Sequence, residues 1–141
     1  MKPGNKKMDL NFQTESELEV KTYDIDAAGH VNNIVYVRWL EDLRNMLFKK
    51  MFDFNNVLTK EYYPVVVSTN IKYKKQLKLF DTPLGNIKLV DYNHGVMNLK
   101  IEIKLNNNIA ASAEQKCVLI NLKTSKMILQ KELNELMSYK F

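Results

Sequence analysis

The feature that most constrains this chain is a long stretch of helical periodicity whose surface is apolar on nearly all sides. It runs from Val31 to about Met51. Placed on a helix at about 100° per residue, its polar side chains fall in one narrow stripe, made of Arg38, Glu41, Asp42, Asn45 and Lys49. Because apolar side chains cover most of the remaining surface, other elements must wrap this helix on most sides. A curved sheet is an arrangement that does so.

The rest of the chain has the two-residue period of β-strands. Before the helix, Glu17–Tyr23 alternates well enough to predict a strand. After it, four strands are predicted, over Tyr63–Leu77, Leu84–Tyr92, Val96–Leu105 and Ile109–Leu122. Met127–Leu129 is expected to extend the sheet and Lys131–Met137 to form a terminal helix. Short turns join the later strands, so we expect an antiparallel sheet with the helix on one face, an α+β domain.

Composition places the chain in the ordinary globular class. It has 141 residues, of which 45% are hydrophobic and 26% are charged, enough for one domain with a core. The single cysteine, Cys117, excludes an internal disulfide. No apolar stretch follows the charged N-terminus, so we expect no signal peptide, no membrane span and a cytoplasmic protein. We expect a flexible N-terminus over residues 1–10 and a single domain over residues 11–141.

The net charge of +5 is spread along the chain, with small lysine clusters at Lys49 and Lys50 and at Lys72, Lys74, Lys75 and Lys78. Such a cluster suits the phosphates of a small cofactor or an acidic carrier protein, although solvated surface lysines explain most of the surplus. Nucleic-acid binding is disfavoured because the lysines lack interleaved exposed aromatic residues.

A crowded polar block precedes the helix. Within the eleven residues 23–33 lie two carboxylates, a glycine, a histidine and two asparagines, namely Asp24, Asp26, Gly29, His30, Asn32 and Asn33. Polar groups at the N-terminus of a buried helix destabilise the fold unless they have hydrogen-bond partners, so they are kept where they have partners or a function. Asn32 is a good helix N-cap. Capping needs only one of the two asparagines, which makes the block the best functional clue in the chain.

This block resembles the signature of hotdog-fold acyl thioesterases. The matching run is Tyr23-x-Asp24-x-Asp26-x-x-Gly29-His30-Val31-Asn32-Asn33-x-x-Tyr36-x-x-Trp39-x-Glu41. It is similar to the 4-hydroxybenzoyl-CoA thioesterase-like group, and its His-Val-Asn-Asn segment also resembles acyl-ACP thioesterases. The resemblance continues through Ile71–Leu77, Asp81–Leu84 and Val118–Lys126. It implies the hotdog fold, in which a curved antiparallel sheet wraps one long helix. It further implies a homodimer joined edge to edge, often paired again into a homotetramer, with active sites at the dimer interface.

The resemblance assigns the chemistry to Asp26, which matches the catalytic aspartate of the 4-hydroxybenzoyl-CoA group. An aspartate can attack a thioester carbonyl or deprotonate a water. The nearby helix N-terminus offers unpaired N–H groups to the oxygen that gains charge. The alternative is that Asp26 stabilises only the loop or the helix start.

Two further residues take their candidate roles from the same resemblance. Asn33 occupies a position that supports catalysis in some relatives, and His30 either orients Asp26, contacts substrate or packs in the turn. Substrate contacts are expected from Gly29, Asn32, Tyr36, Ser68 and Thr69. Asp24 is interpreted as structural. Glu41 is not expected to take part, because it lies about 12 Å along the helix from Asn33.

The sequence therefore predicts an acyl-CoA thioesterase that hydrolyses acyl-CoA to a carboxylic acid and CoA, with no metal or redox cofactor. Two alternatives stay open at this point. The first is an acyl-ACP thioesterase, favoured by the His-Val-Asn-Asn segment and the basic surface. The second is a non-catalytic hotdog protein that binds acyl thioesters.

Overall fold

The computed structural model describes residues 12–138, and the expected flexible N-terminus up to residue 10 lies outside this range. The elements follow in the order β1 (Gln13–Glu17), η1 (Thr22–Asp24, a 3₁₀ turn), α2 (Asn33–Met51), α3 (Phe54–Thr59), β2 (Tyr62–Tyr73), β3 (Leu84–Asn93), β4 (Val96–Leu105), β5 (Asn108–Asn121), β6 (Lys126–Met127) and α4 (Gln130–Ser138). Within residues 12–138, none of the helices combines the length and the hydrophobicity that a membrane-spanning segment needs.

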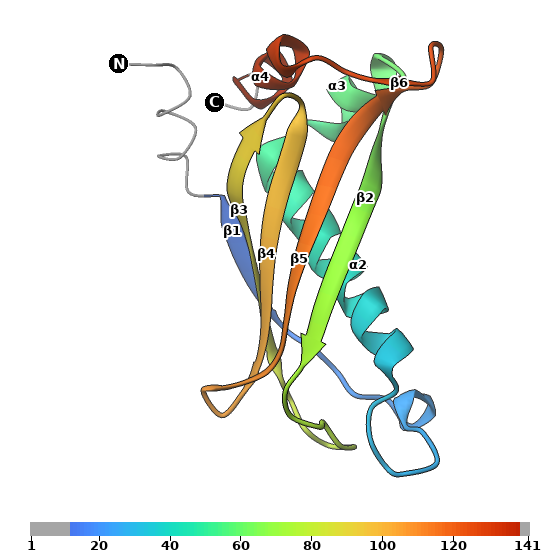
Figure 1. The fold of residues 1–141 in the computed structure, drawn as a ribbon, viewed down its shortest axis with the longest axis vertical. Helices are drawn as coiled ribbons and strands as arrows, with labels where there is room; N and C mark the ends of the chain where they lie inside the picture. Colours follow the sequence, from blue (N-terminus) through green and yellow to red (C-terminus); the bar gives the residue numbers. More distant parts are fainter. Residues whose placement is uncertain (1–11, 139–141) are drawn as a thin grey trace.

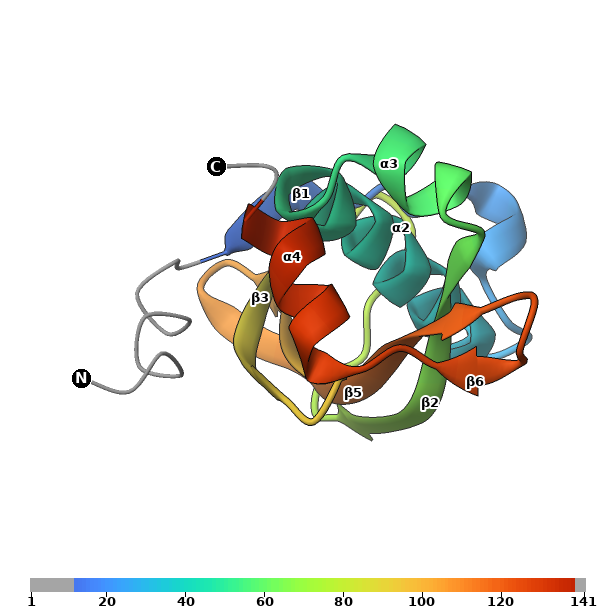
Figure 2. The same ribbon diagram turned by 90° about the horizontal axis from the view of Figure 1, so that it is seen from above.

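The strands form one antiparallel sheet in the order β1-β3-β4-β5-β2, with β6 added to β5. The sheet curves around α2, which lies along its concave face (Figure 1). Seen from above, the strands form an arc around the helix (Figure 2). This is the hotdog arrangement of a curved antiparallel sheet and one long central helix, and it confirms the fold that the sequence predicts.

The core lies between the helix and the inner face of the sheet. Leu40, Leu43 and Leu47 of α2 are at most 1% exposed. They belong to the same core as four inward side chains of β4, which are Met97, Leu99, Ile101 and Ile103. At Gly85 of β3, a Cβ atom would come within 2.7 Å of Leu43 Cδ1. Glycine at this position therefore allows the helix to approach the sheet closely.

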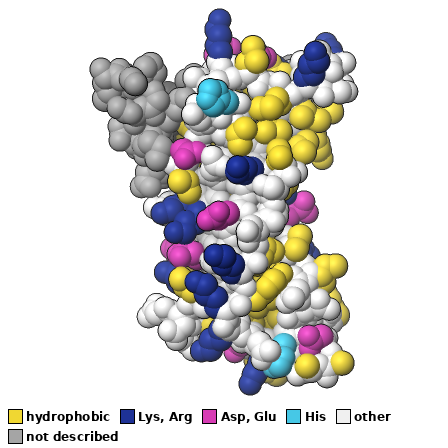
Figure 3. Space-filling model, in the orientation of Figure 1, with side chains coloured by type: hydrophobic (Ala, Val, Ile, Leu, Met, Phe, Trp, Pro, Cys, Tyr) yellow, Lys and Arg dark blue, Asp and Glu magenta, His cyan; other side chains and the backbone are white. Residues whose placement is uncertain are grey.

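The outer face of the sheet is mixed in character. Charged side chains of both signs run down its middle, and apolar side chains gather over β5, β6 and the adjoining end of β2 (Figure 3). Exposed apolar residues of this region include Tyr63, Val67 and Leu122. In β4, the apolar residues face inward and the lysines and the glutamate face outward. This alternation explains why the sequence predicts the bounds of β4 correctly.

Two predictions near the helix need correction. The first strand is Gln13–Glu17 and not Glu17–Tyr23. Leu18 and Val20 alternate inward because this extended segment crosses over the core, where the N–H of Leu18 donates to Pro83 O at 2.8 Å. β2 ends at Tyr73 and not at Leu77. There the chain leaves the sheet edge, and the N–H groups of Lys74 and Lys75 both donate to Ala110 O.

Candidate active site

The polar block folds into a closed loop in front of α2. The N–H of Asp26 donates to His30 O at 2.8 Å, and the N–H of Gly29 donates to Asp26 O at 3.0 Å. Gly29 has a φ of 82°, a left-handed conformation that glycine adopts at little cost. The loop closes where the N–H of Asn32 donates to Asp24 O at 2.9 Å. These bonds hold the loop in one shape relative to the helix start.

The carboxylate of Asp26 has one engaged oxygen and one free oxygen. Oδ1 accepts hydrogen bonds from the N–H of Ala28 at 2.9 Å and from the N–H of His30 at 3.1 Å. Oδ2 has no hydrogen-bond partner among residues 12–138, and the residue is exposed. The loop therefore orients the carboxylate through one oxygen and leaves the other available to a reacting group.

The first turn of α2 presents hydrogen-bond donors beside this carboxylate. Asn32 is the N-cap, as predicted, and its Oδ1 accepts from the N–H of Ile34 at 3.1 Å. The backbone N–H and the side-chain amide of Asn33 have no partner in the described part of the chain. Because the positive end of the helix dipole lies here, these donors suit an oxygen that gains negative charge.

Asp26 and Asn33 both line a cavity of about 500 Å³. One wall carries Asp26, His30, Asn33 and Tyr36, and the other is formed by residues 73–76 at the end of β2. The N–H of Val31 donates to Leu77 O at 2.8 Å, which ties the two walls together below the cavity. The cavity thus brings together the three residues predicted as catalytic and one of those predicted to contact substrate.

Aromatic rings form the base of this cavity. Tyr36 is 3% exposed and packs edge-on against Tyr73, with ring centroids 5.1 Å apart and an interplanar angle of 83°. It makes a second edge contact with Trp39 at 5.3 Å. Burial raises the pKa of the Tyr36 phenol to about 12, with further contributions from Tyr73 and Asp81. The phenol is therefore a neutral hydrogen-bond donor over the whole physiological pH range.

The other four residues predicted to contact substrate do not line this cavity. Gly29 shapes the loop, and Asn32 caps the helix. Ser68 lies on the outer face of β2, where it pairs with Lys116 of β5. Thr69 faces inward and accepts a hydrogen bond from Gln115 Nε2 at 3.1 Å. Glu41 forms an ion pair with Arg44 at 3.2 Å.

The sequence pattern does not predict Tyr73 and Gln76 as site residues, although both line the cavity. Their position depends on how the chain turns after β2, and the local pattern carries no signal of that turn. Lys74 and Lys75, two of the four clustered lysines, also line the cavity. Lys72 lies instead in a separate groove on the outer face of the sheet, with a volume of about 130 Å³.

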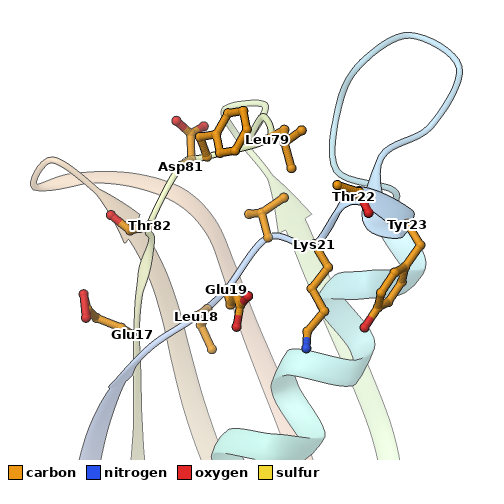
Figure 4. A pocket seen from close by; sticks show the side chains of 11 residues that line it. Glu17, Leu18, Glu19, Lys21, Thr22, Tyr23, Leu79, Asp81 and Thr82 are labelled. Carbon is orange, nitrogen blue, oxygen red and sulfur yellow. The ribbon is translucent and has the colours of Figure 1, made fainter.

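A second cavity, of about 820 Å³, lies between residues 17–23 and 79–82 (Figure 4). It contains none of the predicted site residues. Its carboxylates, from Glu17, Glu19 and Asp81, outnumber its one cation, Lys21. Because this charge repels phosphates, we place the functional site in the smaller cavity, next to Asp26. Among the described residues, no group of three or more His, Cys, Asp or Glu side chains is arranged to hold a metal ion.

The fold and this site define a hotdog thioesterase. The sequence profile of the thioesterase-like superfamily matches residues 20–136, and the chain belongs to this superfamily. The chain is similar to the long-chain acyl-CoA thioesterase FadM of Escherichia coli, with 28% identity over 86% of this chain and 94% of FadM. It is also similar to the putative acyl-CoA thioesterase YneP of Bacillus subtilis, with 32% identity over 57% of this chain and 59% of YneP.

Solved structures agree on the fold. The probable thioesterase YbaW of Escherichia coli superposes with a TM-score of 0.76 at 28% identity, covering 87% of this chain and 97% of YbaW. The 1,4-dihydroxy-2-naphthoyl-CoA thioesterase Slr0204 of Synechocystis superposes with a TM-score of 0.74 at 17% identity, covering 87% and 93% of the two chains. At that identity, the likeness to Slr0204 concerns the fold alone.

Proposed function

We propose that the chain is an acyl-CoA thioesterase, which converts an acyl-CoA and water to a carboxylic acid and CoA. The main support for this proposal is that Asp26 and Asn33 line the same cavity. Oδ2 of Asp26 and the N–H of Asn33 are both without a hydrogen-bond partner among the described residues. Similarity to FadM over nearly the full length of both chains supports the same activity.

The proposed reaction begins at Asp26. Its Oδ2 either attacks the thioester carbonyl carbon or takes a proton from the water that attacks it. The carbonyl oxygen takes the electron pair of the double bond and accepts hydrogen bonds from the Asn33 donors at the helix start. The electron pair then re-forms the carbonyl double bond, the C–S bond breaks, and the sulfur leaves with its electrons. If Asp26 attacks, a water then hydrolyses the anhydride between Asp26 and the acyl group, which releases the carboxylic acid. If Asp26 acts as the base, the acid forms directly and the proton taken by Asp26 returns to solvent. His30, on the same cavity wall, is placed to orient Asp26 or to contact substrate.

Lys74 and Lys75 are the proposed partners of the CoA phosphates. They line the cavity that holds Asp26, whereas the groove that contains Lys72 is on another face of the sheet. The N–H of Lys78 donates to Asp81 Oδ2 at 2.8 Å, which places Lys78 in a turn beside an acidic side chain. Phosphates bind preferentially where cations are unopposed, so the first two lysines are favoured.

A homodimer is the proposed assembly. The sheet ends at β2, and the outer edge of β2 has no strand partner among the described residues. A long unpaired edge favours pairing with another chain. Ile34 and Val37 on the neighbouring face of α2 are 71% and 50% exposed, which leaves apolar surface for a second copy to cover. A homotetramer and a cytoplasmic location stay predictions from the sequence.

Thiol release from acyl-CoA esters of short, long and aromatic acyl groups tests the proposed function. We expect release from at least one ester. The same acyl group on a carrier protein distinguishes the acyl-ACP alternative, because turnover with the carrier substrate alone would contradict the CoA assignment. A thermal shift with acyl-CoA and no release from any substrate would favour a binding protein.

The double variant Lys74→Glu/Lys75→Glu tests the phosphate site. It should raise KM for acyl-CoA about 10-fold, because two cations become anions beside the phosphates. Lys88→Glu/Lys100→Glu is the matched control, since these two lysines pair across β3 and β4 away from the cavity. Equal effects of the two double variants would contradict the assignment of Lys74 and Lys75.

A further inference from the structure

The hydroxyl of Tyr36 has no partner, although its side chain is almost completely buried. Tyr36 is 3% exposed, and its hydroxyl makes no hydrogen bond with any described residue. Buried tyrosine hydroxyls usually find a partner. No side-chain polar atom in the described chain is both sealed from solvent and unpartnered. The hydroxyl must therefore reach open space, and the open space that Tyr36 lines is the cavity beside Asp26.

The position of Tyr36 along the helix places its phenol between Asn33 and the wall that carries Lys74 and Lys75. It follows Asn33 by three residues, so the two side chains lie on the same face of α2, one turn apart. Side chains of a helix tilt toward its N-terminus, which brings the phenol toward Asn33. Its ring also packs on Tyr73, the residue directly before Lys74 and Lys75. The phenol thus lies between the oxyanion donors and the cationic wall.

The order of atoms in a thioester matches this order of side chains. The carbonyl oxygen accepts from the helix start, and the phosphates at the far end of CoA lie near the lysines. The sulfur is the atom that joins the carbonyl carbon to the CoA arm. We propose that the Tyr36 hydroxyl donates a hydrogen bond to this sulfur as the C–S bond breaks, an inference that rests on the proposed thioesterase function.

In this step, the electron pair of the C–S bond moves to the sulfur, and the phenol stabilises the developing thiolate without giving up its proton. The high pKa of the phenol, about 12, keeps that proton on the oxygen. The thiolate then takes a proton from solvent. Tyr36 therefore fills the role of leaving-group stabiliser, which neither Asp26 nor Asn33 supplies.

The test compares Tyr36→Phe with the unaltered protein on two esters of the same acyl group. One is the CoA ester, whose alkyl thiolate is a poor leaving group. The other is the 4-nitrothiophenyl ester, whose aryl thiolate leaves without assistance. Loss of a hydrogen bond to the alkyl sulfur should lower kcat for the CoA ester about 10-fold. The rate for the nitrothiophenyl ester should change less than about 2-fold.

Tyr63→Phe, at an exposed position on β2, is the matched control and should leave both rates unchanged. Equal losses on the two esters would overturn the inference and assign Tyr36 a packing role. An unchanged rate on the CoA ester would also overturn it. Failure of the underlying function has a different signature, because the unaltered protein would then release no thiol from the CoA ester.

Discussion

The carboxylate of Asp24 lies 3.0 Å from Nη2 of Arg38 and is 1% exposed, whereas the arginine side chain is 45% exposed. The second carboxylate oxygen accepts the N–H of Lys21 at 2.9 Å. The backbone oxygen of Asp24 accepts the N–H of Asn32, the helix cap. One residue therefore connects the loop that carries Asp26 to the helix that carries Asn33, through both its side chain and its backbone. This agrees with the structural interpretation of Asp24.

Arg38→Ala should destabilise the protein by about 1–3 kcal/mol, because it leaves a buried carboxylate with only one hydrogen bond. This loss is smaller than for a fully buried ion pair, because Arg38 is half-exposed and solvent screens its charge. Urea unfolding measures the change. Lys49→Ala, on the exposed stripe of the same helix, is the control and should have an effect below about 0.5 kcal/mol. Indistinguishable midpoints for the two variants would contradict a structural role for the pair.

Gln115 should be the buried centre of a second polar network, which links it to the partly buried Arg44 and the exposed Thr69. It is 3% exposed, accepts from Arg44 Nη1 at 3.1 Å and donates to Thr69 Oγ1 at 3.1 Å. Gln115→Leu should cost about 1–3 kcal/mol, because a nearly buried guanidinium loses an acceptor. Thr69→Val should cost about 1 kcal/mol, since it removes a single acceptor. A double-mutant cycle measured by urea unfolding should be non-additive, and strict additivity would argue against a shared network.

Cys117 should be unreactive in the folded protein. It is fully buried, and burial raises the pKa of its thiol from 9.0 to about 11. At pH 8 a disulfide reagent should modify the thiol only after unfolding in urea. The unfolded thiol loses its proton at a lower pH than the folded one. The contribution of the neutral Cys117 thiol to the free energy of unfolding is therefore complete below pH 9.0. It is lost as the pH rises toward about 11. Rapid modification of the native protein at pH 8 would contradict this burial.

Local signals determined much of the fold. The helix end at Met51, the cap at Asn32 and the strand Val96–Leu105 all agree with the sequence pattern. These features depend on periodicity and capping, which are properties of neighbouring residues. Helix α3 was not predicted, because six residues with a single buried side chain, Val57, are too short to show a period.

The site was predicted less completely, because tertiary features decide which way its side chains face. A bulge in β2 between Val66 and Ser68 shifts the alternation by one residue. Val66 pairs with Cys117 on the inner face, and without the bulge Ser68 would face inward as well. With the bulge, Ser68 faces outward and Thr69 faces inward. A register shift of this kind depends on how β2 pairs with β5, so the sequence of β2 alone does not predict it.

The turnover number of Asp26→Asn on the preferred acyl-CoA ester tests whether Asp26 is the base or nucleophile. Asparagine keeps the oxygen that accepts from Ala28 and His30, so the loop and the thermal midpoint should be preserved. It removes the negative charge on the free oxygen, so kcat should fall about 1,000-fold or more. A folded variant whose kcat stays within about 10-fold of the unaltered protein would contradict the assignment of Asp26 as base or nucleophile.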